Sequence, residues 1–259
     1  MVKTLREETG LGMMDCKKAL DETAGDMEAA KDLLRKKGMT TAEKKAGRAT
    51  SEGMVAIRVN AEKTSAAMVM VRCETDFCAR NDVFKQMVGE IADEAMKAAD
   101  GAIPASPRVT ERVQAALAKI GENMSYGKGI KLSAGRVGTY VHHNGKVGVL
   151  IAVDGPVEDA VLADLCMHIA FADPLAVSKN DVPAELIAKE REIATAQAAE
   201  SGKPANIIEK MVEGKVNKFL EVNALIEQPF VRDDKKKVKD ILGAATVRAF
   251  ARFDVGSSK

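Results

Sequence analysis

The residues best suited to binding chemistry lie between an apolar run, 68–73, and an amphipathic run, 82–99. The first run predicts a strand and the second a helix. Between them, Thr75 and Asp76 are residue types that cap helix N-termini. Phe77 beside them is one of only seven phenylalanines. Because a turn that starts a helix tends to be exposed, Phe77 is either a local hydrophobic staple or a probe for a partner.

A glycine-rich segment at 121–129 superficially resembles a phosphate-binding loop. Five residues separate its first two glycines, Gly129 replaces the Ser or Thr that would hold Mg²⁺, and a predicted helix precedes it. We therefore do not expect nucleotide binding there.

The histidines give no catalytic or metal-binding pattern. His142 and His143 are adjacent on a predicted strand, so we expect their rings on opposite faces, unable to share a metal ion. His168 lies on an apolar predicted helix and is typical of a hydrogen-bonded core or interface histidine. No nucleophile, zinc-protease or paired-carboxylate motif occurs. We expect no cofactor, no metal and no enzyme chemistry.

Composition argues against nucleic acid as the partner. The chain has 259 residues with Lys+Arg 39 against Asp+Glu 38, so its net charge is +1 and no overall field favours anions. Aromatics make up 3%, without tryptophan, which leaves few platforms for base stacking. Length and 46% hydrophobic content allow more than one domain.

The four cysteines are scattered, which is typical of reduced, buried thiols in a cytosol. The N-terminus is charged rather than signal-like, and the best apolar run, 147–153, is too short to cross a bilayer. We expect a cytoplasmic protein without membrane contact.

The first 50 residues predict a docking domain and a linker. Glycines divide the segment into three short helices, which would cover 3–9, 13–24 and 26–37. Asp26 is a good N-cap, and Gly38 would end the last helix. Such a small helical core suits docking better than catalysis. Residues 40–50 are polar and basic and predict a tether.

Two β-hairpin-plus-helix units follow and form the predicted core. The first covers 51–134, and the second covers 135–180 and 226–259, where an alternating tail strand completes its sheet. Asn144-Gly145 between apolar strands indicates a tight hairpin in the second unit. Residues 181–225 predict an inserted antiparallel helical hairpin. The predicted fold class is therefore α+β, with two related core subdomains.

Several motifs together resemble the elongation factor Ts family. They are Leu5 to Leu20, Gly25-Asp26, Lys44 to Gly47, Thr75-Asp76-Phe77, Lys119 to Asn123, Ser201 to Pro204, Glu209 to Gly214 and Gln228-Pro229-Phe230. The resemblance covers nearly the whole chain in order. It departs at Cys78, where the family usually has Val, and the chain stops soon after its last strand, where some members carry another helical module.

The resemblance implies a guanine-nucleotide exchange factor that binds elongation factor Tu loaded with GDP, loosens Mg²⁺ and GDP, and lets GTP enter. It implies an N-terminal three-helix domain of the ubiquitin-associated kind that docks on the partner's nucleotide domain. It also implies a turn at Thr75, Asp76, Phe77 and Cys78 that inserts into that domain. The helical hairpin at 181–225 would serve self-association as a homodimer. Further partner contacts implied are Lys17, Ile120, Gly121 and His142.

Two other classes of function remain open from the residues. One is a non-catalytic adaptor or chaperone-like binder that uses the three-helix module in translation. The other is an RNA-binding protein using Lys44 to Arg48 and Lys235 to Lys237, which the neutral charge and scarce aromatics disfavour.

Overall fold

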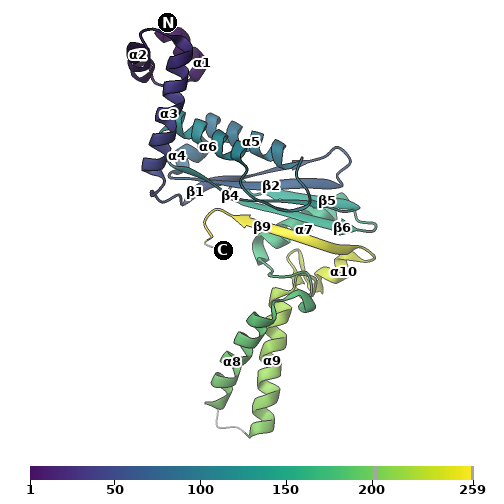
Figure 1. The fold of residues 1–259 in the computed structure, drawn as a ribbon. Helices are drawn as coiled ribbons and strands as arrows, with labels where there is room; N and C mark the ends of the chain where they lie inside the picture. The colour runs from purple at the N-terminus through teal and green to yellow at the C-terminus, as the bar shows by residue number, and fades with distance from the viewer. Residues whose placement is uncertain (201–203, 258–259) are drawn as a thin grey trace.

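The computed structural model describes residues 1–200 and 204–257, apart from the side chains of 39–44. A small helical unit at the N-terminus leads into a core of sheets and helices, from which a long helical hairpin projects (Figure 1). The mixed α+β class predicted from the sequence is confirmed.

Three helices form the N-terminal unit: α1 (Val2–Thr9), α2 (Met13–Glu22) and α3 (Met27–Lys45). Asp26 caps α3 as predicted, because its Oδ1 accepts the N–H groups of Glu28 and Ala29, both at 3.0 Å. The helices enclose one small apolar cluster built from Leu5, Cys16, Ala19, Leu20, Ala30 and Leu34.

The predicted end of the third helix at Gly38 is wrong, because α3 continues to Lys45 and shortens the predicted tether. It packs there against α6 (Pro107–Ile120) of the core. A Cβ added to Gly38 would lie 3.4 Å from the Cβ of Ala118, so the two helices approach closely at this point. Gly38 thus allows helix contact rather than helix termination.

The first sheet is antiparallel in the order β1 (Glu52–Val59), β2 (Ser65–Cys73), β4 (Met124–Ser133) and β3 (Gly101–Ile103). Helices α5 (Asp82–Ala95) and α6 cover one face of it (Figure 1). The sequence predicted neither β3 nor β4. The glycines at 127 and 129 that weaken the strand signal allow close contacts instead, since a Cβ on Gly127 would lie 2.8 Å from Cε of Met70.

The second sheet has the order β5 (Arg136–Val141), β6 (Val147–Asp154) and β9 (Thr246–Asp254), so the predicted tail strand is confirmed. Helix α7 (Asp159–Ala172) covers its outer face. The inner faces of the two sheets pack on each other through a shared apolar cluster made up of Val55, Ala66, Met68, Met70, Val137, Leu150, Ala152, Phe253 and Val255. The core is thus two sheets between two helical layers.

The helical hairpin consists of α8 (Ala184–Ala199) and α9 (Ala205–Asn223), and its predicted connection at 201–203 lies outside the described residues. Its buried side chains are small: Ala194, Ala198, Val212 and Val216. The remaining elements join the hairpin to the second sheet: η1 (Lys179–Asp181), η2 (Leu225–Glu227), β7 (Pro229–Phe230), β8 (Asp233–Lys237) and α10 (Val238–Leu242). Among the described helices, none combines the length and the apolar character needed to span a bilayer.

Candidate functional site

A one-turn helix, α4 (Asp76–Arg80), connects β2 to α5. Thr75 caps it, because its Oγ1 accepts the Cys78 N–H at 3.1 Å. Asn81 ends α4 and caps α5, with its Oδ1 accepting the Val83 N–H at 2.9 Å. Thr75 therefore caps the start of this short helix as its residue type predicted, and Asn81, for which no cap was predicted, lies at its other end.

Phe77 projects from α4 into solvent. Its exposed fraction is 78%, whereas that of the next residue, Cys78, is 2%. Cys78 packs into the first-sheet cluster with Phe84, so it anchors the helix that presents the ring. A hydrophobic staple would bury the Phe77 ring, and this exposure rules that interpretation out. An exposed aromatic side chain on a fixed turn is suited to contact with another molecule.

Hydrogen bonds from the loop after α6 hold the turn in place. The Glu122 carboxylate accepts the Thr75 N–H at 3.1 Å and the Thr75 hydroxyl at 2.9 Å. In return, the Glu74 carboxylate accepts the Asn123 N–H at 2.5 Å. We call these four residues the carboxylate clamp.

Asp76 provides a negative charge in the turn. Its carboxylate pairs with Arg80 one helical turn later at 2.9 Å, and 43% of its side chain remains exposed. It can therefore still accept a hydrogen bond from another molecule.

The thiol beneath the turn is held in its protonated form. A hydrogen bond with the Cys78 thiol, together with burial, raises the pKa of Cys73 well above its ordinary value. The Cys73 Sγ donates to the Thr75 carbonyl at 3.2 Å. This thiol is structural, since reactive thiols are exposed and have lowered pKa values.

Comparison with known proteins decides the family. The family model for elongation factor TS matches residues 74–257. The chain is 47% identical to elongation factor Ts of Thioalkalivibrio sulfidiphilus and 48% identical to that of Hahella chejuensis, in each case over 99% of this chain and 91% of the relative. The same protein from Methylococcus capsulatus is 46% identical over the same shares.

The chain belongs to the elongation factor Ts family. Its membership places it among translation elongation factors and confirms the resemblance found from the sequence motifs.

The residues implied as partner contacts by the elongation factor Ts resemblance lie in two regions. Lys17 is exposed on α2 in the N-terminal unit. Ile120, half-buried against the first-sheet cluster, and Gly121, the left-handed end of α6 with φ 86°, immediately precede the carboxylate clamp. The Gly121 carbonyl accepts a hydrogen bond from Lys45 at the end of α3.

His142 lies at the same end of the core as the α4 turn. In its loop, the Gly145 carbonyl accepts the Val55 N–H at 2.8 Å, and Lys146 pairs with Glu52 at 2.6 Å. Glu52 is in turn the strand partner of Cys73, just before the turn. The loop of His142 and the turn residues thus lie toward the same end of the core, although some 65 positions separate His142 from Phe77 in the sequence.

The prediction that the two adjacent histidines sit on a strand with rings apart is wrong. Strand β5 ends at Val141, and in the following turn the ring centroids of His142 and His143 are only 4.2 Å apart. The His142 Nδ1 also lies 2.7 Å from the Tyr140 hydroxyl. No group of three or more His, Cys, Asp or Glu residues in the described part of the chain is arranged to hold a metal.

His168 is a core histidine, as its apolar helix indicated. It is 2% exposed, its Nε2 lies 2.8 Å from the Gln228 Oε1, and its Nδ1 accepts the Val231 N–H at 3.2 Å. Burial lowers its pKa below the ordinary value of 6.5, against the opposing effect of the Gln228 hydrogen bond.

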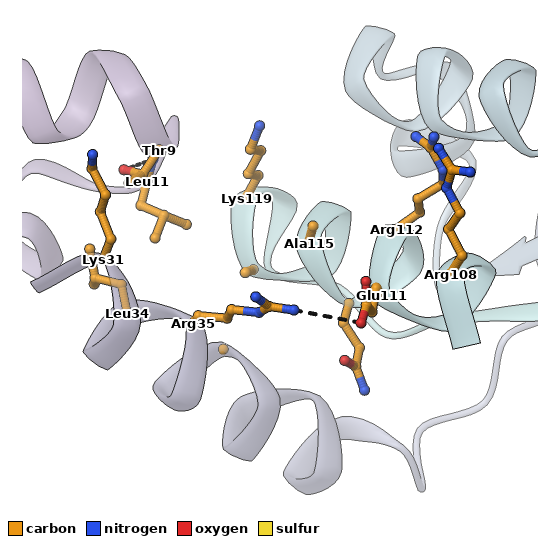
Figure 2. Close-up of a pocket in the computed structure, with 13 residues that line it drawn as sticks. Thr9, Leu11, Lys31, Leu34, Arg35, Arg108, Glu111, Arg112, Ala115 and Lys119 are labelled. Carbon is orange, nitrogen blue, oxygen red and sulfur yellow. Dashed lines mark hydrogen bonds and ion pairs between the residues drawn. The ribbon is translucent and has the colours of Figure 1, made fainter. Parts of the chain in front are cut away.

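A cavity of about 520 Å³ separates the N-terminal unit from α6 (Figure 2). Leu11, Leu34 and Ala115 line it, and the Arg35–Glu111 ion pair at 3.6 Å spans it. Several basic side chains on its rim have carboxylate partners, for example Lys31 with Glu8 and Glu28. None of the turn residues 75–78 is among the residues that line this cavity.

Sequence reasoning missed two features. The role of Glu122 and Asn123 in holding the turn depends on contacts across almost 50 positions, and the only signal was their place in a family motif. Phe171 on α7 is 81% exposed. Its exposure was indicated only by its position on the helix, outside the apolar stripe formed by Val161, Leu165 and Ile169.

Proposed function

We propose that this protein binds elongation factor Tu in its GDP-bound form and promotes exchange of GDP for GTP by displacing Mg²⁺ and loosening the nucleotide site. The observation that carries the proposal is the exposed Phe77 ring on a turn fixed at both ends. Family membership supports the same function. Exchange of this kind requires no covalent chemistry from the chain.

The energetics fit a protein that acts by binding alone. An exchange factor must bind the nucleotide-free or distorted partner more tightly than the loaded one, and the coupling is reciprocal. Weakening nucleotide binding a thousandfold requires about 4 kcal/mol of differential contact energy. Moving one Phe side chain from water into an apolar slot contributes about 1.5–3 kcal/mol. Phe77 would supply a large share of this energy. Asp76 would add a charged hydrogen-bond acceptor that redirects backbone or helix-end groups of the partner away from the Mg²⁺ site.

The remaining contacts follow from the placement of the side chains. We assign Ile120, Gly121 and His142 to the surface around the turn, because they lie at the same end of the core. Lys17 on helix α2 of the N-terminal unit would bind the partner's nucleotide domain. Thr75 and Cys78 would act by holding the turn rather than by touching the partner, since one is a cap and the other is buried.

We further propose that the hairpin at 181–225 mediates self-association. Leu186, Ile193 and Ile207 along it remain about 40% exposed although they are apolar. Light scattering at micromolar concentration tests this idea. We expect a mass of two chains, and a mass of one chain would refute it.

Stopped-flow release of fluorescent GDP from elongation factor Tu tests the exchange proposal. We expect the wild-type chain to accelerate release strongly when Mg²⁺ is present. Because the proposed action removes Mg²⁺ from the site, the acceleration should shrink when a chelator has already removed the metal. An equal acceleration with and without Mg²⁺ would refute the Mg²⁺ step, and no acceleration at all would favour the adaptor alternative.

A further inference from the structure

The carboxylate clamp is reciprocal. Glu122 accepts a backbone N–H from Thr75, and Glu74 accepts a backbone N–H from Asn123. Each loop therefore contributes one carboxylate and one amide to the other. Hydrogen bonds to ionised acceptors are stronger than neutral ones, so the two loops are held in one relative position.

We propose that Glu122 is a positioning residue that holds the turn at the angle from which Phe77 engages the partner. This inference rests on the proposed exchange function and adds a residue that acts through Thr75 without contacting the partner itself.

The turn needs such an external support. Helix α4 has only five residues, and a helix of this length does not persist on its own. Its exposed ring gives it no packing, and Cys78 is its one buried side chain. Glu122 meets the turn at the cap residue, where the carboxylate receives both the N–H and the hydroxyl of Thr75. The same hydroxyl oxygen accepts the Cys78 N–H, so displacing Glu122 disturbs the cap directly.

The residues of the carboxylate clamp also contact the segment that follows the N-terminal unit. The Arg48 carbonyl accepts the Asn123 side-chain amide at 2.8 Å, and the Arg48 guanidinium lies 3.5 Å from the Glu74 carboxylate. Three residues earlier, Lys45 bonds to the Gly121 carbonyl. The N-terminal unit and the turn are therefore both bonded to the segment 121–123, in which Glu122 makes the contacts to Thr75.

Amide hydrogen exchange of the isolated chain tests whether Glu122 holds the turn. In Glu122→Ala, we expect the Thr75 and Cys78 amides to exchange at least about tenfold faster, since each depends on the clamp or on the cap that it fixes. Amides of β6 should be unchanged. Glu111→Ala serves as the matched control, because Glu111 lies on α6, the helix that precedes Glu122, and pairs with Arg35 but does not touch the turn. Unchanged protection at Thr75 would overturn the proposal.

A double-mutant cycle in the GDP-release assay tests whether this support matters for exchange. Glu122→Ala should lower the maximal release rate about tenfold or more, and Glu122→Gln, which keeps one acceptor oxygen, should lower it less. If Glu122 acts by aiming the ring, adding Glu122→Ala to Phe77→Ala should cause little further loss. Additive losses would indicate a general structural role and overturn the proposal.

The two measurements separate this inference from the proposed function. If the wild-type chain leaves GDP release unchanged, the exchange function and the exchange role of Glu122 both fail. The amide measurement, which needs no partner, still decides whether Glu122 holds the turn.

Discussion

Replacing Phe77 by Ala should separate stability from exchange. In the free chain, about a fifth of the side chain is buried, so we expect the free energy of unfolding to change by less than about 0.5 kcal/mol. The 78% that is exposed is available to a partner. Full burial of a Phe side chain is worth about 1.5–3 kcal/mol, so this share corresponds to roughly 1.2–2.3 kcal/mol. At about 1.4 kcal/mol per tenfold, the maximal GDP-release rate should fall about 7- to 40-fold.

The assay is stopped-flow release of fluorescent GDP from elongation factor Tu over a range of concentrations of this protein, paired with urea unfolding of each variant. Phe171→Ala is the matched control, because Phe171 is equally exposed but lies on α7 in the second subdomain. We expect that variant to keep its maximal rate within about twofold, since an exposed side chain away from the turn adds little. A Phe77→Ala rate equal to wild type would refute the role of the ring. A large loss of stability would show that the ring belongs to the fold.

Three further results are expected. Burial lowers the pKa of His168, so the unfolded chain binds a proton at this residue more readily than the folded chain does. The contribution of His168 to the free energy of unfolding should therefore be complete above pH about 6.5 and fall as the pH drops below it. In thermal unfolding from pH 8 to 5, the melting temperature should decline less in His168→Gln than in the wild type. Cys78→Val, a swap of similar volume at a buried site, should cost less than about 1.5 kcal/mol in urea unfolding and leave GDP release unchanged. Gly148→Ala should destabilise by about 1–3 kcal/mol in the same assay, because its Cβ would overlap Val55 between the sheets.

Local chemistry explains which parts of the fold could be predicted. The cap at Thr75, the cap at Asp26 and the turn at Asn144-Gly145 each involve residues only a few positions apart, so their types alone indicate the structure. The tail strand was equally clear from its alternating pattern, and it pairs with β6 as expected. The residue types around Phe77 left open whether its ring is a buried staple or a partner contact, and the folded chain shows it in solvent.

Features that depend on distant partners could not be predicted in this way. Glycine is the residue type that commonly follows the end of a helix, but Gly38 lies inside α3, where the helix packs closely against Ala118 of α6. Strand β4 carries glycines that disfavour strands, yet it pairs with β2 from Met124 to Ser133 with one bulge at Gly127. Glu122 looks like an ordinary residue after a helix, and only the folded chain brings it to Thr75.

The exposed ring and the polar clamp are best understood together. A side chain on a mobile loop would lose conformational freedom on binding, and this loss would offset much of the gain from burying the ring. Here Glu74, Thr75, Glu122 and Asn123 are hydrogen-bonded within the free chain, so a partner of the proposed kind would meet a ring that is already placed. The proposed exchange depends on the difference in affinity between two states of the partner, and a fixed ring would discriminate between them more sharply than an adaptable one. Loosening the clamp should therefore reduce exchange through lost discrimination even where total binding changes little.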